Sequence, residues 1–375
     1  MKDFMNANRE SLVETLKALC TIPAPSHFEN ERAEYCKKWL EGVGAEGVYI
    51  DDALNVIYPI RCEGCDRITV FVAHTDTVFP DREPMPCVDD GAYIRCPGVG
   101  DDTASVAVLL HTARYFAEHP AVAPRGVMLV CNSSEEGLGN LKGTRQLFRD
   151  YEGRIAQLIS FDGIFSGIVD RAVGSHRYEV EAVTEGGHSY GKFGNRNAIA
   201  ELARVIGDIY SIEVPRVGDS KTTYNVGEIS GGTSVNTIAQ SARMLCEYRS
   251  DNEECLAVMQ GHFERIFSEA RARGVDLKVS LIGERPCMGK VDRSRIDRLT
   301  EICRRVIEET AGVTVKTGSG STDCNIPLSL GIPALCIGVY NGGGAHTREE
   351  WVEKASLPVG LEVAIKVVIG ASEEV

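Results

Sequence analysis

The chain has 375 residues, more than one compact core usually holds, so its length predicts two domains. Its composition is that of an ordinary globular protein, and its formal net charge of −14 argues against nucleic acid or an anionic membrane surface as a main partner. No stretch is apolar for long enough to span a bilayer, and the first residues predict an amphipathic helix rather than a signal peptide.

The 13 cysteines follow no framework, which predicts reduced thiols and a cytoplasmic location. The one CxxC pattern, Cys62 with Cys65, has no second pair that would complete a zinc site, so we expect a loop with two thiols. On this interpretation the cysteines take no part in the function.

The first half of the chain alternates between helical and strand patterns. In chain order they predict a helix over residues 29–40, extended runs at 47–50 and 55–60, a strand at 68–73, a helix over 103–117, and strands at 126–131 and 158–161. The run at 68–73, ITVFVA, is continuously apolar, which is typical of a strand buried on both faces. The alternation indicates an α/β fold with a doubly wound, mostly parallel sheet.

The character of the chain changes near residue 172. Residues 178–183 alternate between polar and apolar, as in a sheet with one face open to water. The patterns that follow predict a helix over 198–210, strands at 222–229, 234–238 and 242–248, and a helix over 253–273. The α/β alternation then resumes with a helix over 295–309, strands at 313–316 and 334–337, and a helix over 357–368. We therefore predict a discontinuous first domain, residues 1–172 and 286–375, with a smaller α+β domain, residues 173–285, inserted in it.

His74 and Asp76 directly follow the buried strand at 68–73. A His at the carboxyl end of a central strand lies where α/β sheets place their ligand sites. Asp76 points to the same side if the extended conformation continues, and could accept the second ring N–H of His74. A plain polar loop is the competing interpretation, because HxD is a short pattern.

Asp101 and Asp102 open a predicted helix after two glycines, Gly98 and Gly100. Helix capping alone would explain carboxylates at such a position. The glycines, however, also let the backbone approach another group closely, which capping does not need.

Further polar side chains follow other predicted strands. Glu135 and Glu136 come after 126–131, and two adjacent carboxylates repel each other unless a cation or a shared proton relieves the cost. Asp162 ends the strand at 158–161, and His346 follows three glycines downstream of a strand. A solvated acidic loop, a structural Asp and a surface His are the competing interpretations.

Taken together, these residues offer a mixed set of nitrogen and oxygen ligands that suits borderline divalent metals: His74, Asp101, Glu136, Asp162 and His346. Two metals about 3.5–4 Å apart need a bridging carboxylate and can share a hydroxide poised for attack. One carboxylate then remains as a base. The set therefore predicts a two-metal hydrolase.

The order of these motifs resembles the M20 family of metallopeptidases over essentially the whole chain. The matching segments are AHTDTV, GVGDDTAS, SSEEG, FDG, GGHS, GGTSVNTIA, EYRS, GSTDCNIP and GGGAHTREEW. The family includes tripeptidase T-like aminopeptidases, carboxypeptidases and N-acyl amino acid deacylases. The resemblance implies a metal-binding catalytic domain and, for the insertion, a lid and dimerisation domain that makes the protein a homodimer.

The resemblance also implies a role for each matching residue. His74 and Asp162 would hold one divalent metal, Glu136 and His346 the other, Asp101 would bridge them, Asp76 would orient His74, and Glu135 would be the general base that activates a metal-bridging hydroxide. Zinc is the first choice of metal, and manganese and cobalt suit the same ligands. The family commonly has a cis peptide after the bridging aspartate, here between Asp101 and Asp102.

In the insertion, His188 matches a histidine that reaches the active site of the partner subunit and helps to stabilise the oxyanion. Asn236 and Arg249 match positions that bind the polar groups or carboxylate of the substrate. Ser321 and Thr322 lie in a segment that resembles the substrate side of the family's cleft. The competing interpretations are a turn residue for His188, a solvent-facing Arg249, and a helix N-cap for Ser321 or Thr322.

Three hypotheses about activity stay open. The first is a tripeptidase-like aminopeptidase for short peptides, which GGTSVNTIA and GSTDCNIP favour. The second is an N-acyl amino acid deacylase or a carboxypeptidase of the same family. The third, a non-catalytic binding relative, is disfavoured because Glu135 and all five ligands are present. The sequence contains no GxSxG elbow, which argues against a serine hydrolase.

Overall fold

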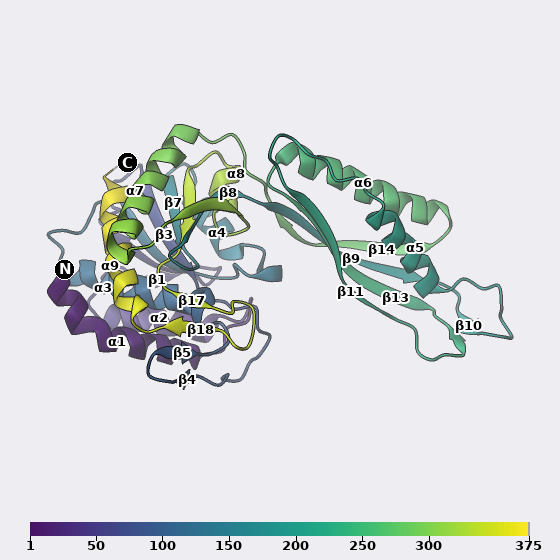
Figure 1. Ribbon diagram of the computed structural model, residues 1–375, viewed down its shortest axis with the longest axis horizontal. Helices are drawn as coiled ribbons and strands as arrows, with labels where there is room; N and C mark the ends of the chain where they lie inside the picture. Colours follow the sequence, from purple (N-terminus) through teal and green to yellow (C-terminus); the bar gives the residue numbers. More distant parts are fainter. Residues whose placement is uncertain (374–375) are drawn as a thin grey trace. The chain divides into compact units, whose positions relative to one another are not determined.

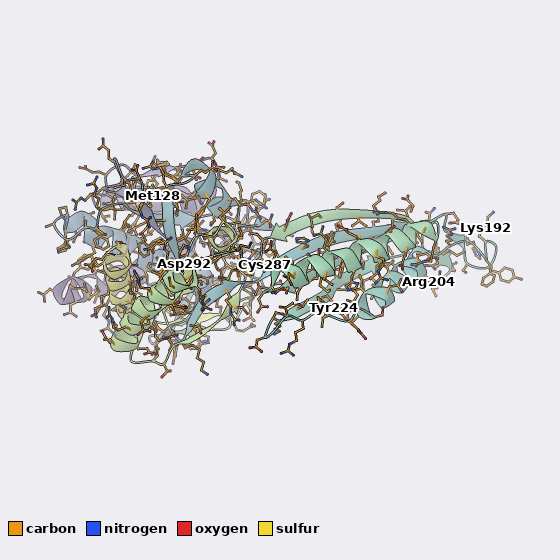
Figure 2. All side chains as sticks on the ribbon, turned by 90° about the horizontal axis from the view of Figure 1, so that it is seen from above. Met128, Lys192, Arg204, Tyr224, Cys287 and Asp292 are labelled. Carbon is orange, nitrogen blue, oxygen red and sulfur yellow. The ribbon has the colours of Figure 1, made fainter. Side chains whose placement is uncertain are left out.

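The computed structural model describes residues 1–373 and divides the chain into two compact units (Figure 1). The larger unit consists of Met1–Ala172 and Gly289–Val375, and the smaller unit, Val173–Met288, is inserted in it. The chain returns to the larger unit between Cys287 and Asp292, which are labelled in Figure 2. Every helix among the described residues is too short or too polar to traverse a bilayer.

A mixed eight-stranded sheet forms the centre of the larger unit. Its strands, in spatial order, are β1 (Tyr49–Ile50), β2 (Val56–Ile60), β6 (Val127–Asn132), β3 (Ile68–His74), β7 (Ile155–Phe161), β16 (Ala334–Ile337), β8 (Gly167–Ala172) and β15 (Lys316–Gly320). β6, β3, β7 and β16 run parallel. β2 and β1 continue the sheet at one edge as antiparallel pairs, and at the other edge β8 is antiparallel to β16 and parallel to β15. β3 and β6 are buried along their whole length, as expected for central strands covered on both faces. The predicted α/β fold with a mostly parallel sheet is confirmed.

The helices of the larger unit are α1 (Lys2–Cys20), α2 (Asn30–Gly42), α3 (Ser105–Glu118), α4 (Lys142–Asp150), α7 (Arg293–Ala311), α8 (Asn325–Ser329) and α9 (Ser356–Ser372). α9 packs against α1, α3 and α7, which explains why it is apolar around most of its circumference. The chain enters α3 through an irregular helical segment, Val99–Ala104. This segment is where Asp101 lies.

A small sheet of very short strands joins two distant parts of the chain. Its order is β17 (Gly342–Gly343), β18 (Trp351–Glu353), β5 (Tyr93–Arg95) and β4 (Val88–Asp89). The loop between β17 and β18 carries His346, and β5 leads toward Asp101, so the pairing of β18 with β5 draws these two residues together. Strands of two or three residues show no periodicity, and the sequence therefore did not predict this sheet.

The smaller unit is a four-stranded antiparallel sheet with two helices. Its strands lie in the order β11 (Thr222–Gly231), β13 (Ser241–Ser250), β9 (Gly174–Val183) and β14 (Asp276–Arg285), and its helices are α5 (Ala198–Tyr210) and α6 (Glu253–Ala272). Alternate residues of β9 and β13, including Val180 and Tyr248, form a core with Phe263 of α6. This is the sheet with one covered face that the alternation at 178–183 predicted.

Two predicted strands differ from the structure. The strand expected at 313–316 begins at Lys316, because Gly312 ends α7 in a left-handed conformation and the next residues connect to the sheet. The strand expected at 234–238 is reduced to β12 (Thr237–Ile238), because Ser234 forms a turn by bonding to Asn236 and Thr237. Strands β8 and β14 were not predicted, although the alternation DLKVSL in β14 could have identified it.

Candidate metal centre

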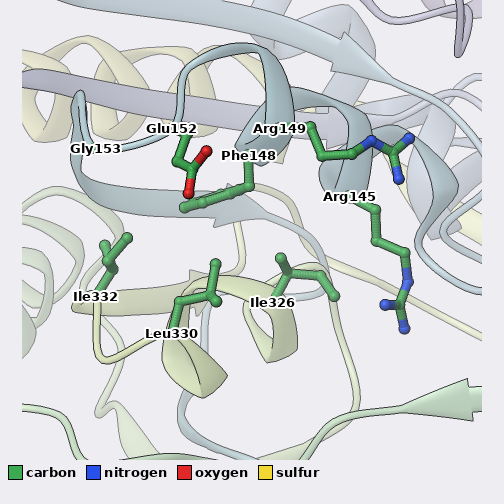
Figure 3. A pocket seen from close by; sticks show the side chains of 8 residues that line it. All are labelled: Arg145, Phe148, Arg149, Glu152, Gly153, Ile326, Leu330 and Ile332. Atoms are coloured by element: carbon green, nitrogen blue, oxygen red, sulfur yellow. The ribbon is translucent and has the colours of Figure 1, made fainter.

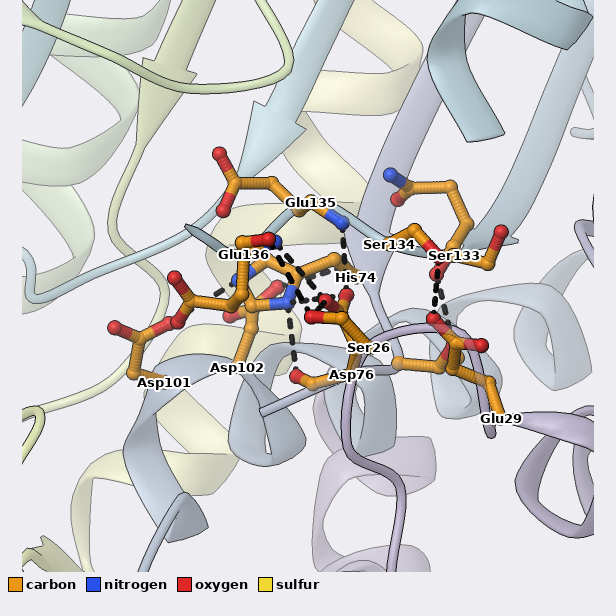
Figure 4. A network of polar contacts seen from close by, with 12 residues as sticks. Ser26, Glu29, His74, Asp76, Asp101, Asp102, Ser133, Ser134, Glu135 and Glu136 are labelled. Atoms are coloured by element: carbon orange, nitrogen blue, oxygen red, sulfur yellow. Dashed lines mark hydrogen bonds and ion pairs between the residues drawn. The ribbon is translucent and has the colours of Figure 1, made fainter. Parts of the chain in front are cut away.

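Three neighbouring parallel strands end at the same edge of the large sheet and carry the first group of site residues. His74 is the last residue of β3, Asp162 follows the last residue of β7, and Glu135 and Glu136 follow β6. Because β6, β3 and β7 are adjacent and parallel, their carboxyl ends bring these side chains together. Figure 4 shows His74 between the loop of Glu135 and Glu136 and the segment of Asp101.

Asp101 is positioned by a residue that sequence reasoning missed, Glu350. The buried Glu350 carboxylate accepts the backbone N–H groups of Gly98 at 2.6 Å, Gly100 at 3.1 Å and Asp101 at 2.8 Å. A Cβ on Gly100 would lie 2.8 Å from Glu350 Oε1, so this glycine serves the close approach and not helix capping alone. The peptide bond between Asp101 and Asp102 is cis, as the family resemblance implies. The only sequence signal for Glu350 is its place in the segment GGGAHTREEW.

Asp101 lies between the two histidines. Its Oδ1 is 3.1 Å from Nε2 of His74, and its Oδ2 is 3.0 Å from Nε2 of His346. The same His346 nitrogen lies 3.4 Å from Oε1 of Glu136. Each carboxylate oxygen of Asp101 therefore lies beside a different imidazole. A ligand that bridges two metals needs this geometry.

Two groups of ligand atoms share Asp101. His74, Asp101 and Asp162 form one group and Asp101, Glu136 and His346 the other, with all atoms of a group within 4.8 Å of one another. Nitrogen and oxygen ligands at 2.0–2.2 Å from a tetrahedral zinc ion are about 3.3–3.6 Å apart, close to the separations found around Asp101. The arrangement fits two ions with a shared carboxylate.

The electrostatics of the site also favour cations. Burial, with help from Asp101, raises the pKa of Asp162 well above its usual value, and burial raises the pKa of Glu136 to about 7. Hydrogen bonds to Asp101 and Glu136 raise the pKa of His346 to about 10. Buried carboxylates so close together are costly unless cations offset their charge, and two divalent metals would do so.

Asp76 supports both His74 and the loop of the two glutamates. Nδ1 of His74 lies 3.1 Å from the backbone carbonyl oxygen of Asp76 and 3.4 Å from its Oδ1. The Asp76 carboxylate also accepts the backbone N–H groups of Glu135 and Glu136, each at 2.9 Å (Figure 4). The hydroxyl of Ser26, which sequence reasoning missed, donates to Oδ2 of Asp76 at 2.6 Å. Burial acts to raise the pKa of Asp76, but the bonds from His74 and these donors hold it below its usual value. Asp76 can thus orient His74 for metal binding and fix the glutamate loop.

With this geometry in place, comparison with known proteins decides the family. The model of peptidase family M20/M25/M40 matches residues 70–369. The chain belongs to this family. Members of the M20 family are hydrolytic peptidases and amidohydrolases that bind metal ions, so the chain is a metal-dependent hydrolase of this group.

Individual relatives of this M20 chain are distant but cover most of its length. The succinyl-diaminopimelate desuccinylase of Corynebacterium glutamicum is 24% identical over 341 residues, which is 88% of this chain and 89% of the relative. A tripeptidase of Staphylococcus aureus has a TM-score of 0.75 at 19% identity and covers 98% of this chain and 99% of its own. A dinuclear metal binding M20 peptidase of Bacillus subtilis has a TM-score of 0.65 at 16% identity, with coverages of 99% and 100%. The two structures agree with the fold of this chain.

Glu135 stands apart from the two M20 ligand groups that share Asp101. It is buried, and one of its carboxylate oxygens lies within 4.8 Å of ligand atoms of His74 and Glu136. Behind the glutamate loop lies a buried carboxylate that sequence reasoning missed, Asp323, which accepts a hydrogen bond from Asn132 at 2.6 Å. Burial, followed by the charge of Glu135, raises the pKa of Asp323 to about 6.

The smaller unit holds three of the predicted site residues. His188 is exposed in β10 (Gly187–His188), which pairs with β12, and the backbone carbonyl of Asn236 accepts the N–H of Ser189 at 2.9 Å. His188 and Asn236 therefore lie close together. Arg249 in β13 donates to both oxygens of Glu247, at 2.7 and 3.0 Å, so its fork already has a partner in this unit. The substrate contacts of all three residues stay predictions.

Ser321 and Thr322 follow β15 in the larger unit. The hydroxyl of Thr322 accepts the N–H of Cys324 at 3.2 Å, and the N–H of Thr322 donates to Asn325 at 2.9 Å. These bonds form the turn that leads into α8. They resemble the helix N-cap that the sequence offers as the competing interpretation for Thr322. A role for Ser321 and Thr322 in substrate binding stays a prediction.

The larger unit also has a hollow that offers no metal ligands of the same kind. It lies between α4 and the segment around α8 and is lined by Arg145, Phe148, Arg149, Glu152, Gly153, Ile326, Leu330 and Ile332 (Figure 3). Its lining has an apolar floor, two arginines and a single carboxylate, without imidazole or thiol. The hollow therefore lacks the mixed set of imidazoles and carboxylates that lies at the sheet edge.

Proposed function

We propose that this M20 enzyme hydrolyses peptide bonds of short peptides, in the manner of a tripeptidase or aminopeptidase, with Glu135 as general base. The observation that carries the proposal is the pair of ligand groups that share Asp101. Two bound divalent ions would lower the pKa of a shared water and polarise the scissile carbonyl. Zinc is the metal we propose first, because imidazole and carboxylate ligands suit it well.

Glu135 is the residue we assign to proton transfer. Asp76 holds the backbone N–H groups of both glutamates, so the loop fixes Glu136 toward the metals while Glu135 lies beside them. Glu135 would take the proton from the attacking water and later deliver it to the leaving nitrogen. No covalent acyl-enzyme is needed, because water itself attacks.

His188 is the donor we propose for the oxyanion, supplied by the partner subunit of a homodimer. Its Nδ1 lies 3.3 Å from the backbone N–H groups of Tyr190 and Gly191, which donate to it. Because Nδ1 accepts, the ring proton sits on Nε2. An exposed Nε2–H is the kind of preorganised donor that a tetrahedral oxyanion requires.

The second candidate function is removal of an acyl group from an N-acyl amino acid, or carboxypeptidase cleavage. The desuccinylase relative favours this alternative, whereas the tripeptidase favours the first. Both reactions use the same proton transfers by Glu135 and differ only in what flanks the scissile amide. The bidentate Arg249 could serve either, since both substrates carry a carboxylate.

The test is a rate comparison over free dipeptides and tripeptides, amino-blocked peptides and N-acetyl and N-succinyl amino acids, each with zinc, manganese or cobalt. We expect the free tripeptides to give the highest kcat/KM and amino blocking to reduce it strongly. If N-acyl amino acids are the best substrates, the enzyme is a deacylase. If none of the amides is cleaved with any metal, the proposed reaction is wrong.

A further inference from the structure

Three cysteines from separate segments of the larger unit come together, and none of them belongs to the proposed ligand set of the metal centre. They are Cys20 at the end of α1, Cys87 before β4, and Cys96 directly after β5. Their sulfur atoms all lie within 4.8 Å of one another, and all three are free thiols. We propose that these residues, the thiol site, bind one thiophilic d¹⁰ cation, with Zn²⁺ as the first choice.

The spacing suits a shared ion. Three thiolates at about 2.3 Å from a tetrahedral zinc lie about 3.8 Å from one another. Because the three sulfur atoms lie within 4.8 Å of one another, they would need to move only slightly to bind one ion. A disulfide would use only two of the three sulfurs and leave the third unpaired. An ion uses all three, and its binding displaces the remaining thiol protons to solvent with no change of oxidation state.

Two of the three cysteines are buried, and the third is partly exposed to solvent. Cys20 is 5% exposed and Cys96 is 2% exposed, so two ligands lie inside the fold. Cys87 is half-buried and lies at the outer side of the site. An ion can therefore enter past Cys87 and be held by buried sulfur.

Contacts among the three thiols, followed by burial, raise the pKa of Cys20 and Cys96, although the bond with Cys20 by itself lowers that of Cys96. Two positive charges act in the opposite direction, Lys17 on Cys87 and Arg32 on Cys96. Lys17 lies one turn before Cys20 in α1, and its charge lowers the pKa of Cys87 after the larger effect of the hydrogen bonds from Cys20 and Cys96. Arg32 is buried, and its Nε has no hydrogen-bond partner among the described residues. Arg32 also has no carboxylate in ion-pair contact within residues 1–373, although a buried cation usually requires an anion.

Thiols of the site also act on the charge of Arg32. Burial lowers the pKa of Arg32, and the charges of Cys20, Cys36 and Cys96, followed by that of Asp76, act against that lowering. The guanidinium also donates to the carbonyls of Leu19 at 3.0 Å and Ile22 at 2.7 Å, which fixes it beside the end of α1. One zinc with three thiolates carries a net charge of −1, which Arg32 and Lys17 can offset.

The thiol site lies next to the segment that carries Asp101. The N–H of Cys96 donates to the carbonyl of Glu350 at 3.2 Å, and its carbonyl accepts the N–H of Val99 at 3.1 Å. A bound ion would thus join α1, the chain before β4 and the start of the Asp101 segment. We assign it a structural role, because three sulfur ligands from three segments act as a cross-link.

Cobalt tests the proposal on the full-length reduced protein, because only thiolate ligands give Co²⁺ an intense charge-transfer band in the near ultraviolet. We expect wild-type protein to bind three Co²⁺ per chain and to show this band. Cys87→Ser should bind two Co²⁺ and lose the band. Cys65→Ser is the matched control, since Cys65 is a partly exposed free thiol outside the site, and it should match wild type.

The readout separates this proposal from the catalytic one, because imidazole and carboxylate ligands do not produce the band. Retained peptide hydrolysis by Cys87→Ser would show that the variant is folded, and Cys96→Ser should lose the band as well. No band in the wild-type protein would overturn the proposal. A band of wild-type strength in Cys87→Ser, or a disulfide between two of the three cysteines after purification without reductant, would overturn it too.

Discussion

The proposed metal centre and the thiol site lie in the same unit and differ in ligand type and in how the fold supports them. The centre gathers imidazoles and carboxylates at the carboxyl edge of one sheet, and Asp76 and Glu350 hold its ligand segments by hydrogen bonds. The thiol site gathers sulfur from a helix end, a loop and a strand end, with Lys17 and Arg32 nearby as positive charges.

This difference indicates different uses of a metal. Nitrogen and oxygen ligands with open positions leave room for water and substrate, whereas several thiolates from separate segments favour a structural ion. The centre should therefore control turnover, and the thiol site should affect the cohesion of its surroundings. Variants that change one property and leave the other intact can test the distinction.

The largest effect on turnover is expected from Glu135→Gln. Loss of the general base should lower kcat/KM by about 10²- to 10⁴-fold while the metal content stays near that of wild type. Steady-state kinetics with a tripeptide and elemental analysis of the same samples measure both quantities. Glu152→Gln, on the exposed lining of the hollow in Figure 3, is the control and should retain full activity. If Glu135→Gln hydrolyses the tripeptide at the wild-type rate, Glu135 is not the general base.

A smaller loss of turnover is expected from His188→Ala. Removal of one oxyanion donor should reduce kcat by about 10²- to 10³-fold with little change in KM, and neither metal site should lose ions. His262→Ala, a change of another histidine in the smaller unit, serves as the control. Equal kcat in wild type and His188→Ala would contradict the oxyanion role.

Glu350→Gln should weaken metal binding at the centre without touching the thiol site. The amide keeps one acceptor oxygen but cannot accept all three N–H groups of the Asp101 segment. Loss of such a supporting group typically costs 10- to 100-fold in metal affinity, so we expect about that change in a zinc competition titration. The adjacent exposed Glu349→Gln should bind zinc as wild type does. If both variants bind equally, Glu350 does not position Asp101.

The two sites also differ in how far the sequence predicts them. The strands at 68–73, 126–131 and 158–161 are mainly apolar runs, so the sheet edge with His74, Glu136 and Asp162 follows from the pattern alone. His346 joined the predicted ligand set only from its position after three glycines and an apolar run, because the strands that place it beside Asp101 are too short to show a period.

The sequence did not predict the residues whose role depends on contacts between distant parts of the chain, and there is a physical reason for this. Glu350 and Asp323 matter because of what they contact across the fold, and a single carboxylate in a sequence carries no sign of that. Cys20, Cys87 and Cys96 have no regular spacing, so the expectation that the cysteines take no part in function rested on pattern alone. Residue spacing in a sequence can identify ligands that lie on one helix, strand or loop. It cannot identify ligands that the fold brings together from several elements.

The most direct test of the account is the anomalous scattering of a crystal of the protein loaded with zinc. Besides a separate peak at the thiol site, we predict two strong peaks at the edge of the large sheet, about 3.5–4 Å apart and one on each side of the Asp101 carboxylate, with His74 and Asp162 at one and Glu136 and His346 at the other. A single peak at this edge of the sheet, or two peaks that do not share Asp101, would contradict the two-metal centre.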